Sequence, residues 1–332
     1  MLRYLLHRVL LMIPTLLAIS VFTFVIIQLP PGNYLETLIA DLKAAGEPGD
    51  LQKVEFLRQQ FGLDQPWPVQ YWRWLKGLLH GDLGYSFEYD RPVSEIIGER
   101  LVLTFVVSFG AILLTWAVAF PIGVYSATHQ YSWGDHGLTL LGFLGLATPN
   151  FLLALVLMFV SYTWFGVSVG GLFSPELQEA PWSWAKAVDL LEHLWIPVLV
   201  IGTSGTAGMI RRLRANLLDE LRKPYVVTAR AKGLPPGRVL LKYPLRIALN
   251  PFISDIGNLL PQVISGSIIV SIVMSLPTTG PMLLRALRTQ DMYLAGSFLM
   301  LLATLTVVGV FLSDLALAAL DPRIRQGAGR SR

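Results

Sequence analysis

The chain has 332 residues, of which 53% are apolar and only 14% are charged, and its formal net charge at pH 7 is +4. Soluble domains carry about 25% charged residues, so this composition indicates a membrane protein rather than a soluble one. The sequence has no cysteine, which excludes a disulfide framework, a cysteine-ligated zinc site and a thiol nucleophile. The small basic excess is distributed as in membrane proteins, so we expect no nucleic-acid partner.

Long apolar runs recur along the chain. A helix needs about 20 residues to cross the roughly 30 Å hydrocarbon core of a bilayer. The first run is longer than the core of a signal peptide and no small-residue cleavage site follows it, so we interpret it as a retained helix. We expect the run at 138–165 to tilt or to end early, and the more polar run at 252–276 to face protein rather than lipid. The six predicted spans are residues 9–29, 101–125, 138–165, 194–210, 252–276 and 293–320.

The distribution of lysine and arginine predicts the orientation of these spans. With both termini in the cytosol, the inner segments hold 16 basic residues and the outer segments hold 10, whereas 16 of the 22 acidic residues lie outside. The inner turn at 126–137 has no lysine or arginine, but the sum over all segments decides the orientation. The sequence therefore predicts an all-α polytopic membrane protein with about six transmembrane helices. Its parts are a first span (1–29), a long extracytoplasmic segment (30–100) and a five-span core (101–332) with a cytoplasmic loop (211–251).

The segment at 30–100 is too long and too rich in aromatic residues to be a simple linker. Pro68 favours the first turn of a helix that we expect to end near His80. Aromatic rings on such a helix settle at the membrane surface, so we interpret it as an interfacial anchor, with contact to an extracytoplasmic partner as the alternative. The aromatic residues concerned are Trp67, Tyr71, Trp72 and Trp74.

A basic segment between the fourth and fifth predicted spans has the punctuation of a short helix. Pro224 is tolerated in a first helical turn, Gly233 is a natural residue just after a helix, and prolines at 235 and 236 prevent continuation. We therefore predict a helix over 225–232. A helix of this length is unstable alone, so it must pack against something. The residues expected near one face are Tyr225, Val226 and Ala229.

At these residues the chain resembles the membrane-spanning permease subunits of bacterial ABC importers of the oligopeptide, dipeptide and nickel class. The cytoplasmic loop of that family carries a Glu-Ala-Ala-x-x-x-Gly consensus, and its peptide branch reads Thr-Ala-Arg-Ala-Lys-Gly-Leu. Residues 228–234 match the peptide form in full. Of the generic form only Ala229 and Gly233 match, and Tyr243 and Pro244 depart from the usual histidine-containing pair.

The resemblance extends over nearly the whole chain. The N-terminal segment at 2–17, the outer motif at 61–66 and the Gly-Asp-Leu-Gly-x-Ser motif at 81–86 all look like family features. The turn at 277–280 is a degraded form of the family's Pro-Gly-x-Gly, and the Asp-Pro-Arg-Ile-Arg run at 321–325 looks like its C-terminal ending.

The resemblance implies a division of labour among several chains. This chain would form half of a translocation pathway for oligopeptides or similar small solutes in the bacterial cytoplasmic (inner) membrane, beside a second, homologous permease subunit. Two separate cytosolic ATPase subunits would hydrolyse ATP, and an extracytoplasmic binding protein would deliver the substrate. The chain has no GxxxxGK[ST] phosphate-binding loop, so we expect it to have no ATPase activity of its own. We also expect no cofactor, and no metal site, because the spans carry no cluster of metal-ligating residues. The residues implied to couple to the ATPase are Tyr225, Thr228, Ala229, Arg230, Ala231, Lys232, Gly233 and Leu234.

Three other functions remain open. Some relatives of this type of importer carry oligosaccharides, and residues 29–35 weakly favour that substrate. An intramembrane serine protease would use Ser204, but its histidine base is expected in the last span, and no histidine follows His193. We therefore interpret the small residues at 202–208 as a helix-packing face.

A proton-coupled transporter is the third alternative, because such proteins place ionisable groups inside the membrane. Asp255 and Asp314 are the acids within predicted spans, and we interpret them as interfacial acids or as partners of the basic loop. The pathway itself should be lined by the polar face of the fifth span. The candidate pathway-lining residues are Asn258, Gln262 and Ser265.

Overall fold

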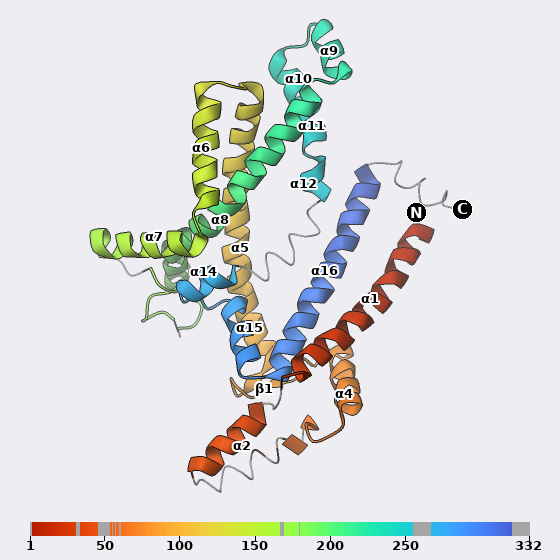
Figure 1. Ribbon diagram of the computed structural model, residues 1–332, viewed down its shortest axis with the longest axis vertical. Helices are drawn as coiled ribbons and strands as arrows, with labels where there is room; N and C mark the ends of the chain where they lie inside the picture. Colours follow the sequence, from red (N-terminus) through yellow and green to blue (C-terminus); the bar gives the residue numbers. More distant parts are fainter. Residues whose placement is uncertain are drawn as a thin grey trace.

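The computed structural model describes residues 2–30, 34–45, 54, 56, 58, 59, 61–166, 169–178, 180–254 and 267–320. Its helices are α1 (Leu2–Gln28), α2 (Tyr34–Ala45), α4 (Trp67–Leu79), α5 (Val93–Thr128), α6 (Trp133–Ala147), α7 (Asn150–Phe165), α8 (Trp184–Leu221), α9 (Pro224–Ala231), α10 (Pro236–Lys242), α11 (Pro244–Ala248), α12 (Asn250–Ser254), α14 (Ile268–Val273), α15 (Thr279–Arg288) and α16 (Met292–Leu320). Two short strands, β1 (Tyr85–Ser86) and β2 (Arg91–Pro92), pair antiparallel. The α5–α6 turn, α9 and α10 lie at the top of Figure 1, and α2, α4 and β1 lie at the bottom.

Three helices, α1, α5 and α16, are long and apolar enough to cross a membrane. Two further candidates are bent: α6 and α7 meet at 96°, and the two halves of α8 meet at 46°. If each bent pair is one span, the described residues hold up to five spans. The predicted fifth span at 252–276 lies largely outside the described residues, which stop at 254 and resume at 267. The total of six spans therefore stays a prediction.

The run at 138–165 does not form one straight helix. We expected it either to tilt or to end early, and the early end is confirmed. Helix α6 ends at Ala147, and Thr148 adopts an extended conformation with φ −82° and ψ 119°. Pro149 explains this, because a proline ring disfavours a helical conformation of the preceding residue and proline has no N–H to donate. Helix α7 then leaves at nearly a right angle to α6 (Figure 1).

Helices α5 and α8 pack closely over several turns. A methyl group on Gly202 would lie 3.1 Å from the carbonyl oxygen of Ala111, which is tighter than ordinary van der Waals contact. The hydroxyl of Thr115 donates to the Gly202 carbonyl oxygen at 3.0 Å, and a methyl group on Gly205 would also touch Thr115. The predicted packing role of the small residues is thus confirmed at Gly202 and Gly205, whereas Gly208 faces open space.

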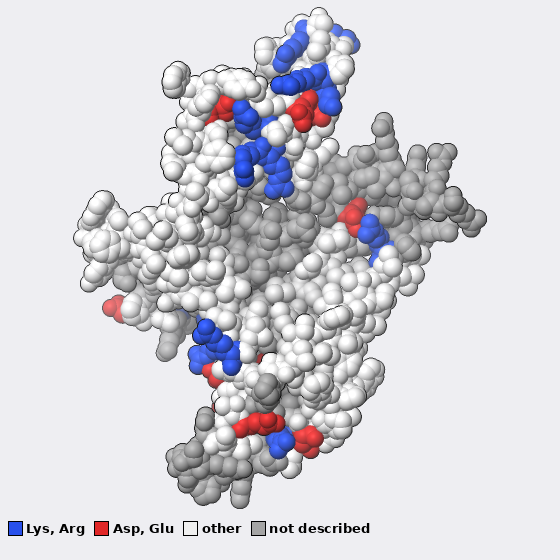
Figure 2. Space-filling model, viewed as in Figure 1, with Lys and Arg blue, Asp and Glu red and all other residues white. Residues whose placement is uncertain are grey.

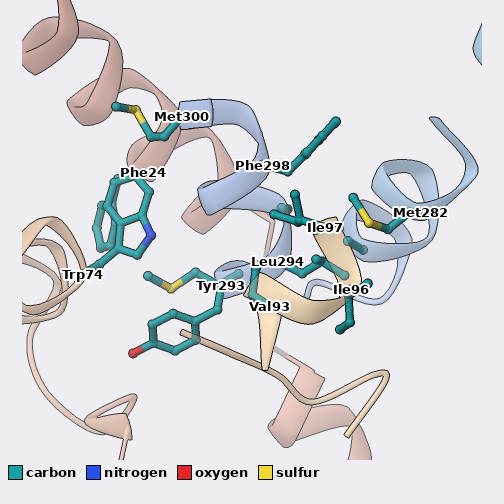
Figure 3. Packing of buried hydrophobic residues seen from close by; sticks show 13 residues of the cluster. Phe24, Trp74, Val93, Ile96, Ile97, Met282, Tyr293, Leu294, Phe298 and Met300 are labelled. Carbon is teal, nitrogen blue, oxygen red and sulfur yellow. The ribbon is translucent and has the colours of Figure 1, made fainter. Parts of the chain in front are cut away.

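The segment that follows α1 folds onto the long helices at the bottom of Figure 1. Figure 3 shows a cluster of buried side chains there, to which α1, α4, α5, α15 and α16 all contribute. The ring of Trp74 on α4 is buried 6.0 Å from the ring of Phe24 on α1, and Tyr71 shares a 2.8 Å hydrogen bond with Ser20. Helix α4 is therefore anchored on α1 through one face.

The aromatic residues of α4 divide between two environments. The helix covers Trp67–Leu79, close to the predicted range, and Trp67 and Trp72 are exposed as an interfacial anchor requires. Tyr71 and Trp74 instead face the protein core. The sequence indicated the aromatic content correctly but not which rings point inward, because that depends on where α1 lies.

The Gly-Asp-Leu-Gly-x-Ser motif at 81–86 binds the N-terminal end of α16. Gly84 has a φ of +85°, and a methyl group there would lie 2.4 Å from the ring of Tyr293, so both the backbone and the space require glycine. The hydroxyl of Ser297 donates to the Leu83 carbonyl oxygen at 2.7 Å. The hydroxyl of Ser86 donates to Oδ2 of Asp291 at 2.6 Å.

Asp291 is a fully buried carboxylate that caps α16 through the backbone N–H of Leu294. Burial raises the pKa of its carboxyl group above the ordinary value, although hydrogen bonds from Ser86, Leu294 and the Glu88 backbone act in the opposite direction. Because the pKa is raised, the ionised carboxylate destabilises the folded state, and this penalty disappears as the pH falls through the folded pKa.

We therefore predict how Asp291→Asn changes the pH dependence of stability. The variant carries no charge at this position, so its melting temperature does not rise through protonation of a buried carboxylate as the pH falls. The melting temperature of the wild type minus that of Asp291→Asn should increase as the pH falls from 7 towards the ordinary aspartate pKa of about 4. Thermal unfolding of the two purified proteins in detergent measures this difference. Asp64→Asn, which changes an exposed acid, is the control and should show no such trend; a difference independent of pH at Asp291 would contradict the prediction.

Candidate functional site

The short basic helix predicted over 225–232 is present as α9, which covers Pro224–Ala231. Helix α8 ends at Leu221, and Lys223 is extended with ψ 146°, as expected for a residue before proline. Pro224 then occupies the first helical turn, where its missing N–H costs nothing. The start of α9 is thus set by local chemistry.

The end of α9 is a Schellman-type turn. The backbone N–H of Gly233 donates to the Arg230 carbonyl oxygen at 2.9 Å, and that of Leu234 donates to the Ala229 carbonyl oxygen at 3.4 Å. Gly233 has a φ of +77°, which glycine adopts without strain. Pro235 and Pro236 follow, and they begin α10 instead of prolonging α9.

Helices α9 and α10 form a small unit with its own apolar core. Val226 and Ala229 of α9 pack with Val239 of α10, and all three are buried. Tyr225, Leu234 and Tyr243 pack around this cluster. The sequence predicted that Tyr225, Val226 and Ala229 lie near one face of the helix. The structure shows that this face packs against α10, with Val239 as a partner that the sequence did not identify.

Two attachments hold the α9–α10 unit on the long helices. The hydroxyl of Tyr225 donates to Oε2 of Glu220 at the end of α8, and burial together with this hydrogen bond raises the pKa of Tyr225. Beyond α10, the buried Ala248 of α11 packs with Leu213 and Leu217 of α8. The unit is therefore connected to α8 at both of its ends.

The outer face of α9 is solvent-exposed. Val227, which the predicted coupling residues did not include, is 60% exposed. Ala229 is buried and Leu234 half-buried inside the unit, so these two residues support the helix and do not present a surface. Figure 2 shows Lys and Arg gathered over this end of the molecule. The exposed members of the predicted set are Thr228, Arg230, Ala231, Lys232 and Gly233.

Of the residues considered for the pathway and for the alternative functions, the structure places the side chain of Asp314 but not those of the others. Asn258, Gln262, Ser265 and Asp255 lie outside the described residues, as does the side chain of Ser204. Asp314 forms an ion pair with Arg8 of α1 at 2.9 Å, so its partner is the N-terminal segment and not the basic loop. Within the described part of the chain, no three His, Asp or Glu side chains gather closely enough to hold a metal ion.

The role of the left-handed backbone conformation of Gly233 in ending α9 can be tested by substitution. Gly233→Ala should destabilise the α9–α10 unit by about 1–2 kcal/mol, because a side chain is strained in the left-handed region. Neighbouring atoms play no part, since nothing lies within 4 Å of the position of the added methyl group. Hydrogen exchange of the backbone over 224–242 should therefore become faster.

Gly237→Ala is the matched control for this change. Gly237 also has open space around it, but it lies inside α10 with a negative φ, so alanine should be neutral or should slow exchange. Equal exchange rates in the two variants would refute the role of the backbone conformation at Gly233.

Comparison with known proteins covers both parts of the chain. Residues 119–326 match the family model described as binding-protein-dependent transport system inner membrane component, and residues 1–108 match the model of its N-terminal region. The oligopeptide transport system permease protein AppB of Bacillus subtilis is 35% identical over 325 residues, which cover 97% of this chain and 98% of AppB.

Other relatives are similar over the same length. A putative peptide permease protein of Brucella ovis is 34% identical over 98% of this chain and 99% of its own. The glutathione transport system permease protein GsiC of Pectobacterium atrosepticum is 34% identical with the same coverage. The chain therefore belongs to the family of inner-membrane components of binding-protein-dependent transport systems, and it is a permease subunit of an ABC importer.

Proposed function

We propose that this chain forms half of the translocation pathway of an ATP-driven peptide importer and receives its driving force through α9. The observation that carries the proposal is the α9–α10 unit, which is clamped to α8 and presents an exposed outer face. A helix that short is stable only when packed, and here its inner face is packed by the chain itself. The exposed face is thus left for a separate chain, the cytosolic ATPase.

Movement would pass from the ATPase into the membrane through the two attachments of this unit. A displacement of α9 pulls on the end of α8 through Tyr225 and Glu220, and on the side of α8 through α11. Helix α8 is packed tightly on α5, so the two helices would move together. Rigid-body rocking of packed elements is a common way of switching between two states.

We also propose the membrane orientation and the partner subunits that the sequence implies. Both termini, the α5–α6 turn and α9 would face the cytosol, and residues 30–100 would lie outside as a separate extracytoplasmic part before the core at 101–332. Six spans would cross the bacterial inner membrane, with the loop at 211–251 on its inner face. The excess of lysine and arginine in the inner segments supports this orientation. A second permease subunit would complete the pathway, and an extracytoplasmic binding protein would deliver the substrate.

Peptides are the proposed substrate because the names of the relatives refer to oligopeptides, peptides and glutathione. Oligosaccharides are the second candidate, on the sequence of residues 29–35. The pathway-lining role of Asn258, Gln262 and Ser265 remains part of the proposal, because the polar face of the fifth span is the surface that a hydrophilic solute would need.

The contact with the ATPase is testable because the chain has no cysteine of its own. Val227→Cys labelled with benzophenone maleimide should cross-link to the ATPase subunit in the assembled transporter, since Val227 is 60% exposed on the outer face of α9. Gel electrophoresis and mass spectrometry of the adduct identify the cross-linked chain.

Leu79→Cys is the control, because Leu79 is at least as exposed as Val227, at 76%, but lies on α4 at the opposite end. It should be labelled without cross-linking to the ATPase. A membrane-impermeant maleimide should reach Leu79→Cys in intact cells and Val227→Cys only after permeabilisation. Cross-linking of Val227→Cys to lipid alone, or its labelling from outside, would refute the proposed docking.

A transport assay separates the proposed function from its alternatives. The complete complex with its binding protein, reconstituted in liposomes, should take up a labelled oligopeptide only when ATP is supplied to the ATPase side. Uptake of an oligosaccharide but not of peptides would overturn the substrate. Uptake driven by a proton gradient without ATP would overturn the ATP-driven mechanism.

A further inference from the structure

A cavity of about 710 Å³ lies between α6 and α8, near the end of the molecule that carries α9 and α10 (Figure 1). Its walls are mainly apolar, and Leu140 and Phe143 of α6 form one side while remaining exposed on the outside of the bundle. Two arginines of α8, Arg211 and Arg214, line it as well. The cavity thus combines an apolar wall with cationic groups.

Two contacts between α6 and α8 bound this cavity. Near the α5–α6 turn, Arg214 donates from Nε to Oδ1 of Asp135 at 3.2 Å and from Nη2 to Oδ2 at 2.8 Å. Farther along the helices, Gly142 lies opposite Ala207, where a methyl group on the glycine would be 3.7 Å from the alanine Cβ. Seven residues of α6 separate the two contacts, which corresponds to about 10 Å of helix.

The charges of the cavity do not cancel. Asp135 is buried, and its carboxylate accepts hydrogen bonds from Arg214 and from the backbone N–H of Tyr131 at 3.0 Å. The charges of Asp135 and Arg214 therefore neutralise each other. Arg211 has no such partner: among the described residues it forms no ion pair, and its guanidinium lies 5.6 Å from the centre of the Phe143 ring. One positive charge is therefore available to an anion.

The position of Arg211 selects the kind of anion. Arg211 directly follows the apolar run at 194–210, so it lies where the membrane-embedded part of α8 gives way to its basic part. Tyr131 and Trp133, at the same end of α6, are 75% and 94% exposed, as is typical of aromatic residues at a membrane interface. A ligand here meets a cation at headgroup level and an apolar wall on the membrane side, which matches a phospholipid.

We propose that the cavity between α6 and α8 binds an anionic phospholipid, whose phosphate pairs with Arg211 and whose acyl chain lies on Leu140 and Phe143. Basic pockets between transmembrane helices bind such headgroups. A zwitterionic lipid brings its own cation close to Arg211 and is disfavoured. The bound lipid braces α6 against α8 at the base of the coupling loop, and this role does not depend on which substrate is transported.

The test is native mass spectrometry of the purified full-length chain titrated in detergent with dioleoyl phosphatidylglycerol or dioleoyl phosphatidylcholine. The wild type should bind the anionic lipid more tightly than the zwitterionic one. Arg211→Ala should weaken binding of phosphatidylglycerol about fivefold, which is the effect of one interfacial cation. Arg211→Lys should restore most of it, because the charge returns.

Arg238→Ala is the matched control, since Arg238 is an exposed cation on α10 outside the cavity. It removes the same charge and should leave lipid binding unchanged. An equal loss in both variants, equal affinity for the two lipids, or displacement of phosphatidylglycerol by inorganic phosphate at millimolar concentration would each overturn the proposal.

A second measurement does not depend on any arginine variant. A photoreactive amino acid in place of Leu140, activated in the assembled transporter in its native membrane, should form an adduct with phospholipid. An adduct with the second permease subunit instead would show that a protein covers the cavity, and it would refute lipid binding.

Discussion

The close packing of α5 on α8 is the constraint on which the rest of the molecule depends. Gly202 and Gly205 bring the two backbones so near that a larger side chain at Gly202 could not be accommodated without movement. Helix α8 has 38 residues, about 57 Å measured along its bent axis, and α6, α7 and α11 also pack on it. Because α8 cannot shift without α5, anything attached to the end of α8 is attached to the whole bundle.

The α9–α10 unit is attached in this way, which explains how so short a helix is held in a fixed position. Its own apolar core holds α9 against α10, and the hydrogen bond between Tyr225 and Glu220 joins that core to α8. The inner residues Val226 and Ala229 provide rigidity, and the outer residues provide a surface. In the proposed coupling, the inner face would hold α9 in place and the outer face would contact the ATPase. The proposed lipid site lies beside the same end of α8.

Much of the candidate site could be predicted from the sequence, because its determinants are local. Pro224 and Gly233 specify the start and end of α9 through their own backbone chemistry, whatever surrounds them. Thr148 and Pro149 break the third apolar run for the same reason. That Tyr225, Val226 and Ala229 share one face of α9 also followed from helical periodicity. The partner Val239 and the exposure of Val227 did not, because they depend on how α10 folds back.

The sequence by itself determined the membrane class through its apolar runs, the family through motifs such as the one at 228–234, and the position of α9 through its proline and glycine punctuation. Each of these signals lies within a short stretch of the chain. Only the tertiary structure decided which aromatic rings of α4 turn inward, that Asp314 pairs with Arg8, and that the motif at 81–86 binds α16 through Asp291. These contacts join residues far apart in the chain. Their geometry depends on helix packing, and no local pattern of residue types encodes it.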